Sequence, residues 1–238
     1  MLPAQDEIQM QGVRLDTLPW SQDEMRGWLL SEEAARADAF VFDRDRTRFL
    51  RRRGALKAAL AGYLDAEPSH VPLVWDERGK PRLRGGEIRF SATASEELAL
   101  FAFCLDREVG VDIEQVRKRS DDIEVARHFF SPAEVAELES TDLESRARAF
   151  LRMWTLKEAL AKATGDGMAV HVRRTAREGE QWVRGKPWTV GRLAWEPGLE
   201  AAFAIEGRSP RIVWVSGACG SLGPRGDGPG SACRCGVY

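Results

Sequence analysis

Three short segments near the middle of the chain are apolar or alternate apolar with other residues. They span residues 88–94, 98–105 and 109–114 and are rich in β-branched, aromatic and leucine side chains, which is typical of strands. The links between them are short, and short links favour an antiparallel meander. Further strands are predicted at 12–20, 181–190, 200–206 and 211–215.

Apolar residues recur at helical spacing towards the C-terminal half, at Phe150, Leu151, Trp154, Ala159 and Ala163. This spacing predicts an amphipathic helix that stops at Gly165-Asp166-Gly167. A longer helix is predicted at 43–64 and a short one at 122–130. Two more helices are expected to begin at the N-cap residues Ser31 and Ser131.

Composition excludes several classes of protein. The chain has 238 residues, a formal net charge of −2 and 43% hydrophobic residues, which fits a globular protein and not a polyanion-binding one. No membrane span or signal peptide is recognisable. Four cysteines are too few and too unevenly spaced for a disulfide scaffold, so a cytoplasmic location is expected. The glycine-rich stretch 216–238 is predicted to be a disordered tail, and its Cys233-Arg234-Cys235 lacks the spacing of a zinc site.

Asp112 and Glu114 are two residues apart on the predicted strand 109–114. Their side chains therefore project from one face, and Val111 and Ile113 project from the other. Two neighbouring carboxylates suit a cation such as Mg²⁺, which commonly takes one or two carboxylates together with waters and phosphate oxygens. The alternative is an exposed acidic face without a metal, the commoner meaning of an isolated Asp-x-Glu.

Basic residues gather in the predicted helix 43–64. They are Arg44, Arg46, Arg48, Arg51, Arg52, Arg53 and Lys57. Three interpretations are open: a solvated face, a nucleic-acid-binding patch, or a clamp for the phosphates of a small ligand. Arginine suits the last of these because its planar guanidinium can bind two phosphate oxygens at once.

The acidic strand and the later helix together resemble a known family. Gly110-Val111-Asp112-Ile113-Glu114, followed by Trp154-Thr155-Leu156-Lys157-Glu158-Ala159, is similar to the signature pair of the long, Sfp-type phosphopantetheinyl transferases. Between them, Arg127-His128-Phe129-Phe130-Ser131 resembles the Arg-Phe-Phe-Ser run of that family, with one residue inserted. Gly79-Lys80-Pro81 precedes the central strands, as it does in the family.

The resemblance implies an α+β fold. Two similar αβ subdomains, each an antiparallel sheet with packed helices, would form a pseudo-dimer with the ligand in the cleft between them. Residues 1–106 are expected to hold the nucleotide end of the ligand. Residues 107–215 are expected to hold the Mg²⁺ and to dock the carrier protein, and the enzyme is expected to be a monomer.

The resemblance also implies a reaction, in which the 4′-phosphopantetheine arm of coenzyme A moves to a serine of an apo acyl or peptidyl carrier protein. The family's metal ligands match Asp112, Glu114 and Glu158; Glu158 would also be the base, and Lys162 would stabilise the leaving group. The residues expected to contact coenzyme A are Arg48, Arg53, Lys80, Thr93 and Lys162. The basic loop Arg117-Lys118-Arg119 and the helix 122–130 are expected to dock the carrier protein.

One stretch departs from the family pattern. The usual Ser-His-Ser run is replaced by Thr93-Ala94-Ser95, and Ala94 cannot replace an imidazole at the nucleotide end of coenzyme A. Two alternatives to a transferase follow. One is a carrier-protein-binding module with little turnover, which Ala94 favours. The other is a nucleic-acid-binding protein that uses the basic helix, which a nearby acidic cleft disfavours because it would repel phosphates.

Overall fold

The computed structural model describes residues 2–117, 122–168, 175 and 177–216. The predicted loop residues Lys118 and Arg119 and nearly all of the predicted tail 216–238 lie outside these residues. The helices in the described part are α1 (Gln22–Gly27), α2 (Ser31–Asp38), α3 (Asp43–Leu64), α4 (Asp122–Phe129), α5 (Pro132–Ser140) and α6 (Arg146–Thr164). Short 3₁₀ turns follow at η1 (Leu15–Thr17) and η2 (Pro68–His70).

The strands form two large sheets and one small ribbon. The first sheet has the order β10-β1-β5-β4 and the second the order β6-β9-β8-β7, and β2 pairs with β3. Their bounds are β1 (Glu7–Arg14), β2 (Leu73–Trp75), β3 (Pro81–Leu83), β4 (Ile88–Ser95), β5 (Leu98–Leu105), β6 (Val109–Gln115), β7 (Gly179–Val183), β8 (Lys186–Arg192), β9 (Leu199–Glu206) and β10 (Arg211–Trp214). The predicted α+β class, with antiparallel sheets and packed helices, is confirmed.

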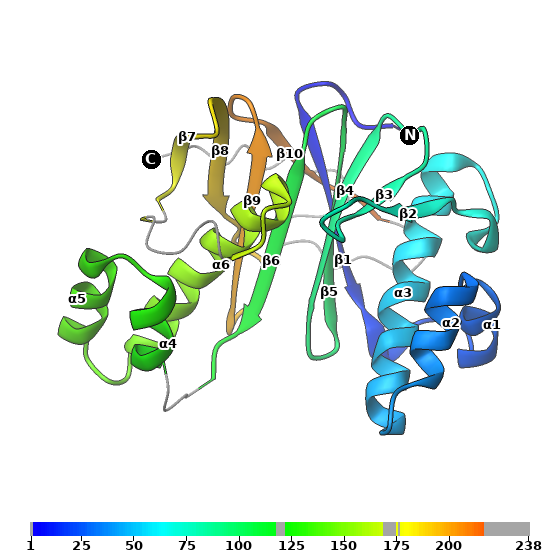
Figure 1. Ribbon diagram of the computed structural model, residues 1–238, viewed down its shortest axis with the longest axis horizontal. Coiled ribbons are helices and arrows are strands. Elements are labelled where there is room, and N and C mark those ends of the chain that lie inside the picture. The colour runs from blue at the N-terminus through cyan, green and yellow to red at the C-terminus, as the bar shows by residue number, and fades with distance from the viewer. Residues whose placement is uncertain (1, 118–121, 169–174, 176, 217–238) are drawn as a thin grey trace.

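Helix α3 covers the outer face of the first sheet (Figure 1). Its buried Leu56 and Leu60 belong to one apolar cluster with Phe101 and Phe103 of β5. The helix has the bounds that its sequence pattern predicts, and it ends where Asp65 adopts a left-handed conformation with φ of 49°. The first sheet and α3 therefore form one half of the molecule around their own core.

Helix α6 covers the outer face of the second sheet (Figure 1). Ala159 and Ala163 lie over Gly110 of β6, where an added Cβ atom would be 2.0 Å from the Ala159 carbonyl oxygen and 2.4 Å from the Ala163 nitrogen. Only glycine allows the helix backbone to approach the strand so closely. The helix ends at Gly165, whose φ of 71° is the left-handed cap expected of its glycine.

Gly110→Ala is expected to lower the melting temperature, because the atoms that a new Cβ would meet belong to helix backbone and cannot rotate away. Overpacking of this kind typically costs about 1–3 kcal/mol, or about 2–4 °C per kcal/mol for a protein of this size. Gly62→Ala on α3 is the matched control, since an added Cβ there meets nothing within 4 Å. Thermal unfolding followed by circular dichroism compares the two. Equal melting temperatures would contradict the close approach of α6.

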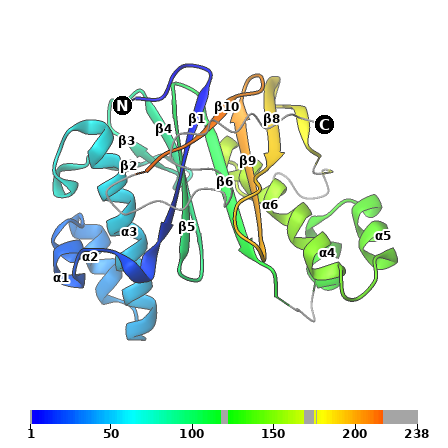
Figure 2. The ribbon, with the colours of Figure 1, turned by 180° about the vertical axis from the view of Figure 1, so that it is seen from behind.

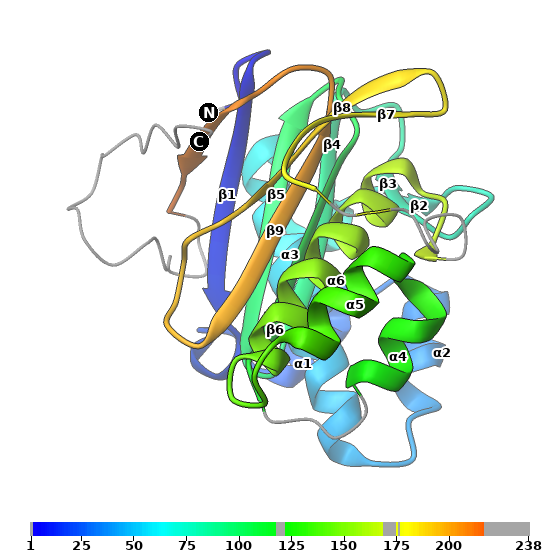
Figure 3. The same cartoon turned by 90° about the vertical axis from the view of Figure 1, so that its left-hand side faces the viewer.

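The inner faces of the two large sheets pack against each other. Met10 and Ala102 of the first sheet share a buried apolar cluster with Val111 and Phe203 of the second. Figures 2 and 3 show β10 leaving the end of β9 and crossing to the first sheet beside β1, and its pairing with β1 is parallel. The last described strand thus belongs to the first sheet, although it was expected with the half that spans 107–215. The division into 1–106 and 107–215 otherwise stays a prediction.

The predicted meander of three strands is wrong at its third member. β4 and β5 pair antiparallel, but β6 leaves the first sheet and pairs antiparallel with β9. β4 and β6 are consequently the edge strands of two different sheets, and they run side by side where the halves meet (Figure 1). Local spacing could not distinguish these pairings, because β9 lies about ninety residues further along the chain.

Two predicted strands have different bounds in the structure. The stretch 181–190 is a hairpin of β7 and β8, whose turn at Arg184 and Gly185 has φ values of 53° and 74°; positive values at both positions are typical of a two-residue hairpin turn. The first strand is β1 and not 12–20, and residues 15–17 form a 3₁₀ turn. Gln9 of β1 is buried and accepts a 2.6 Å hydrogen bond from the Tyr63 hydroxyl. Buried polar residues such as Gln9 interrupt the apolar pattern by which a strand is predicted.

The serine-capped helices differ in detail. Ser131 is the N-cap of α5 and forms the predicted capping box with Glu134. Ser31 is the first residue of α2 and Leu30 is its N-cap, with the Glu33 carboxylate accepting the Leu30 N–H at 3.0 Å. Across the described ranges, no helix combines the length and the apolar composition that crossing a bilayer requires.

Candidate active site

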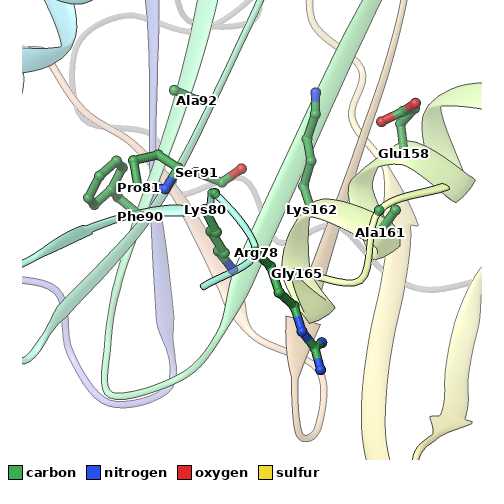
Figure 4. Close-up of a pocket in the computed structure, with 12 residues that line it drawn as sticks. Arg78, Lys80, Pro81, Phe90, Ser91, Ala92, Glu158, Ala161, Lys162 and Gly165 are labelled. Carbon is green, nitrogen blue, oxygen red and sulfur yellow. The ribbon is translucent and has the colours of Figure 1, made fainter. Parts of the chain in front are cut away.

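A cavity of about 290 Å³, here called the central cavity, lies between β4, α6 and the turn that joins β2 to β3. Figure 4 shows Ser91 and Ala92 on the strand side, and Lys162 and Glu158 rising from the helix. Glu158 and Lys162 are four residues apart and share the exposed face of α6, as their spacing predicts. The close packing of α6 on Gly110 brings these two side chains up to β6.

Asp112 lies beside this cavity and is almost completely buried, with 4% of its surface exposed. Its Oδ1 accepts a 2.5 Å hydrogen bond from Lys162 Nζ and a 3.0 Å bond from the Thr93 hydroxyl. Burial raises the pKa of Asp112, and the Lys162 ammonium and the Thr93 hydroxyl oppose that rise. The structure therefore joins three predicted site residues, from β4, β6 and α6, by direct contacts.

Glu158 is half-buried on the same cavity. Its burial raises the pKa of its carboxyl group, the nearby Lys162 ammonium lowers it, and the Asp112 carboxylate raises it again. Asp112 and Glu158 are thus close enough to influence each other, with one ammonium group serving both. A carboxylate with a raised pKa that faces a cavity is a good candidate for a general base.

The predicted metal ligands are only partly brought together. Within the described residues, no group of three or more histidine, cysteine, aspartate or glutamate side chains is clustered closely enough to hold a metal ion. The predicted three-carboxylate cluster of Asp112, Glu114 and Glu158 is therefore not assembled as such. The Asp112–Glu158 pair still fits Mg²⁺, since Mg²⁺ often takes only one or two carboxylates beside phosphate oxygens. Asp112 Oδ2, moreover, is buried and accepts no hydrogen bond.

Lys80 lines the central cavity but points its ammonium into the protein. Its Nζ donates to Glu108 Oε2 at 2.7 Å, to the Val109 carbonyl at 3.3 Å and to the Ala163 carbonyl at 2.9 Å. Burial lowers the pKa of Lys80, and the Glu108 carboxylate opposes that effect. In this structure the three hydrogens of the ammonium have protein acceptors, so Lys80 ties the β2–β3 turn to the start of β6 and the end of α6.

A second cavity of about 300 Å³, here called the arginine cavity, lies beside the first and within the N-terminal half. Arg36, Arg52 and Arg53 surround it, and Thr93 and Ala94 of β4 form part of its wall. Its floor is apolar, with Phe49, Leu56 and Phe101. A pocket with several guanidinium groups above an apolar floor suits a phosphorylated ligand that also carries an apolar ring.

Two of the predicted nucleotide-binding residues thus line the arginine cavity, Arg53 and Thr93. Arg53 forms an ion pair with Glu33, with 2.8 Å between Arg53 Nε and Glu33 Oε1. Arg48 lies on neither of the two cavities, and it reaches the β4–β5 turn, where its Nη2 donates to Glu96 Oε2 at 2.9 Å. The predicted role of Arg48 in phosphate binding therefore has no support from its position.

Sequence reasoning did not single out three of the arginines on these cavities. Arg52 belongs to the basic run of α3, where the sequence does not distinguish it from its neighbours. Arg36 lies on α2 and is therefore not part of that run. One signal for Arg36 is its i, i+3 spacing from Glu33, which places both on one face of α2. Arg78 lines the central cavity and its guanidinium contacts the buried Asp166; only its position one residue before Gly79-Lys80 could have indicated it.

The predicted carrier-docking loop is described only at its first residue. Arg117 Nη2 lies 2.9 Å from Glu96 Oε1 on the β4–β5 turn, and Lys118 and Arg119 lie outside the described residues. The helix predicted at 122–130 is α4, which packs with α5 and α6 around Phe130 and Phe150. The docking surface itself remains a prediction.

Comparisons with known proteins agree with this geometry. A model of the 4′-phosphopantetheinyl transferase superfamily matches residues 108–190, which include β6 and α6. The chain is 35% identical over 210 residues to the 4′-phosphopantetheinyl transferase HetI of Nostoc sp., a match that covers 85% of this chain and 89% of HetI. It is 37% identical over 144 residues to a putative 4′-phosphopantetheinyl transferase of Synechocystis sp., covering 59% and 58% of the two chains.

A more distant relative is the 4′-phosphopantetheinyl transferase Sfp of Bacillus subtilis. It is 24% identical over 167 residues, which cover 68% of this chain and 73% of Sfp. The match to HetI extends well beyond the superfamily segment and includes most of both chains. The chain therefore belongs to the 4′-phosphopantetheinyl transferase superfamily.

Proposed function

We propose that this chain transfers the 4′-phosphopantetheine arm of coenzyme A to a serine of an apo acyl or peptidyl carrier protein. The observation that carries the proposal is the contact of Lys162 with the buried Asp112 beside the central cavity, with Glu158 one helical turn before Lys162. This arrangement supports a site in which a phosphoryl group lies between an acid–base group and a cation. Phosphoryl transfer depends mainly on such positioning and charge stabilisation.

The proposed step conserves atoms and charge. The serine oxygen forms a bond to the phosphorus atom that carries the pantetheine arm, and the bond from that phosphorus to the bridging oxygen breaks. The serine proton passes to the Glu158 carboxylate, directly or through a water molecule. The electron pair of the broken bond stays on the leaving 3′,5′-ADP, where the Lys162 ammonium stabilises the new charge.

Magnesium belongs to the proposal as the metal of the site. Asp112 and Glu158 are the residues that would hold it. When bound, Mg²⁺ polarises a phosphoryl group and neutralises charge on a leaving oxygen. The buried Oδ2 of Asp112, which accepts no hydrogen bond, supports this assignment.

The arginine cavity is proposed to hold the nucleotide end of coenzyme A. Arg36, Arg52 and Arg53 lie around it, and their planar guanidinium groups suit the 3′-phosphate. The cavity adjoins the central cavity, with which it shares Pro81 and Ala92. One ligand can therefore extend from the arginines to Lys162.

Ala94→His is expected to lower KM for coenzyme A by roughly ten- to a hundredfold with little change in kcat. Ala94 lies on the wall of the arginine cavity, so an imidazole there could add one charge-assisted hydrogen bond to the 3′-phosphate, worth about 1.5–3 kcal/mol. A change in KM alone is the mark of uniform binding. Kinetics with coenzyme A and with dephospho-coenzyme A compare the two proteins. If the variant has the wild-type kcat/KM for both coenzyme A and dephospho-coenzyme A, Ala94 is not next to the 3′-phosphate.

The function is tested by following the nucleotide product. Coenzyme A, Mg²⁺ and a panel of apo acyl and peptidyl carrier proteins are incubated with the enzyme, and 3′,5′-ADP is measured by chromatography. One 3′,5′-ADP is expected for each carrier serine modified, with formation stopping in EDTA and returning when Mg²⁺ is in excess. Full activity in EDTA would remove the metal from the proposal, and no 3′,5′-ADP with any carrier would contradict the transfer.

A further inference from the structure

The two halves meet along β4 and β6, and this boundary is joined by side chains. The strands belong to different sheets, so no backbone ladder connects them. Instead, Ser91 Oγ of β4 accepts the Val111 N–H at 3.1 Å, and Ser95 Oγ accepts the Gln115 N–H at 3.2 Å. Both donors lie 20 residues after their acceptors, so the two strands run parallel and in register.

Thr93 stands between the two serines on β4, and residues two apart on a strand share a face. Its hydroxyl donates to Asp112 Oδ1 at 3.0 Å and accepts the Lys162 ammonium at 3.2 Å. Ser91, Thr93 and Ser95 therefore form one row of hydroxyl groups, here called the hydroxyl row. Ser91 and Ser95, at its two ends, accept backbone N–H groups of β6. Thr93, at its centre, contacts Asp112 and Lys162.

We propose that Ser91 and Ser95 are positioning residues, which hold β6 at a fixed offset from β4 so that Asp112 stays in contact with Thr93 at the wall of the arginine cavity. This inference rests on the proposed function. The described residues that line the arginine cavity are all in the segment 36–101, whereas Asp112, Glu158 and Lys162 come from the second half. Alignment of the halves is consequently needed for transfer, but not for binding a nucleotide within the first half.

Four variants test the inference. Ser91→Ala and Ser95→Ala each remove one bridge, and Ser95→Thr keeps the hydroxyl as the conservative rescue. Thr189→Val is the matched control: its buried hydroxyl donates to the Gly207 carbonyl at 2.8 Å within the second half and lines neither cavity. The measurements are kcat for carrier modification, the Kd of adenosine 3′-phosphate, which lacks the 5′-phosphate that would meet Lys162, and amide hydrogen exchange at Val111 and Gln115.

The two alanine variants are expected to lose about 10- to 100-fold in kcat, since small misplacements of catalytic groups have effects of this size. Their Kd for adenosine 3′-phosphate should equal that of the wild type, because this ligand needs only the arginine cavity of the first half. Exchange should become faster at Val111 in Ser91→Ala and at Gln115 in Ser95→Ala. Ser95→Thr and Thr189→Val should keep the wild-type kcat and the wild-type exchange at both amides.

Three results would overturn the inference. The first is a wild-type kcat in both alanine variants, and the second is unchanged amide exchange in both. The third is a parallel loss of kcat and of affinity for adenosine 3′-phosphate, because it would indicate general unfolding. If Ser91→Ala does not fold, Ser95→Ala decides, since its bond lies at the exposed end of the strand. A wild-type enzyme that modifies no carrier contradicts the proposed function instead, and the exchange rates still test the bridges.

Discussion

Glu158→Gln is expected to lower kcat by about 10²- to 10⁴-fold, the usual contribution of a general base. The amide keeps the size of the side chain, so the central cavity keeps its shape, but an amide cannot take the proton of the carrier serine. Binding of coenzyme A should change little by comparison. Steady-state kinetics at saturating carrier protein measure the effect. Glu158→Asp, which keeps a carboxylate, should retain more activity than Glu158→Gln, and a wild-type kcat in Glu158→Gln would show that Glu158 is not the base.

The pH dependence of the wild type gives an independent check on Glu158. Its burial raises the pKa of the carboxyl group above the ordinary 4.5, the Asp112 charge adds to that rise, and Lys162 opposes it. The Glu158 carboxyl of the EDTA-treated enzyme should therefore titrate above 4.5, which carboxyl-carbon NMR measures. Lys162→Met removes the opposing ammonium and should raise this pKa further. An unchanged pKa in the variant would show that Lys162 does not act on Glu158.

Asp112→Asn is expected to lower kcat/KM on the order of 10²- to 10³-fold, as removal of a fixed charged group at a reacting centre does. Asparagine has nearly the same shape, but it cannot anchor the Lys162 ammonium by charge, and it is a poorer ligand for Mg²⁺. The fold should survive. Because burial raises the pKa of Asp112 above its ordinary 3.8, stability falls as the pH rises from that ordinary value through the raised pKa, and asparagine removes this cost at neutral pH. Lys162 remains partly exposed and can reach water.

The measurements for Asp112→Asn are kcat/KM and the melting temperature, which we expect to move by no more than about 2–4 °C. Glu206→Gln is the matched control, since it removes another short lysine contact, 2.6 Å from Lys186 Nζ, at the far end of β9. That variant should keep full activity. If Asp112→Asn does not fold, or if it keeps the wild-type kcat/KM, the Asp112–Lys162 contact has a structural role and not a catalytic one.

Much of this site could be predicted because its signals are local. The period of two on β6 correctly separates Asp112 from the buried Val111 and Ile113, which face the core between the sheets. The four-residue spacing of Glu158 and Lys162 correctly places both on one face of α6. The bounds of α3 follow from its pattern, and tertiary packing supports the same helix, since its buried Leu56 and Leu60 pack on the first sheet.

The remainder depends on contacts between distant segments. No local pattern shows that β6 pairs with β9, or that β10 returns to the first sheet beside β1. The same holds for Arg48 and Arg53, since both lie on one basic helix and only tertiary packing turns Arg48 to Glu96 and Arg53 to the arginine cavity. Lys80 is a third case. It lies beside a cavity, but its ammonium donates hydrogen bonds to Glu108 and to the Ala163 carbonyl, which the sequence does not reveal.

The most direct test of the central claim is the intact mass of an apo carrier protein after incubation with this enzyme, coenzyme A and Mg²⁺. The mass should increase by one phosphopantetheine group. The increase should require the carrier serine, and Glu158→Gln and Asp112→Asn should slow it strongly. An unchanged carrier mass with the wild-type enzyme, across both acyl and peptidyl carriers, would contradict the account. So would an increase that is equally fast with Glu158→Gln.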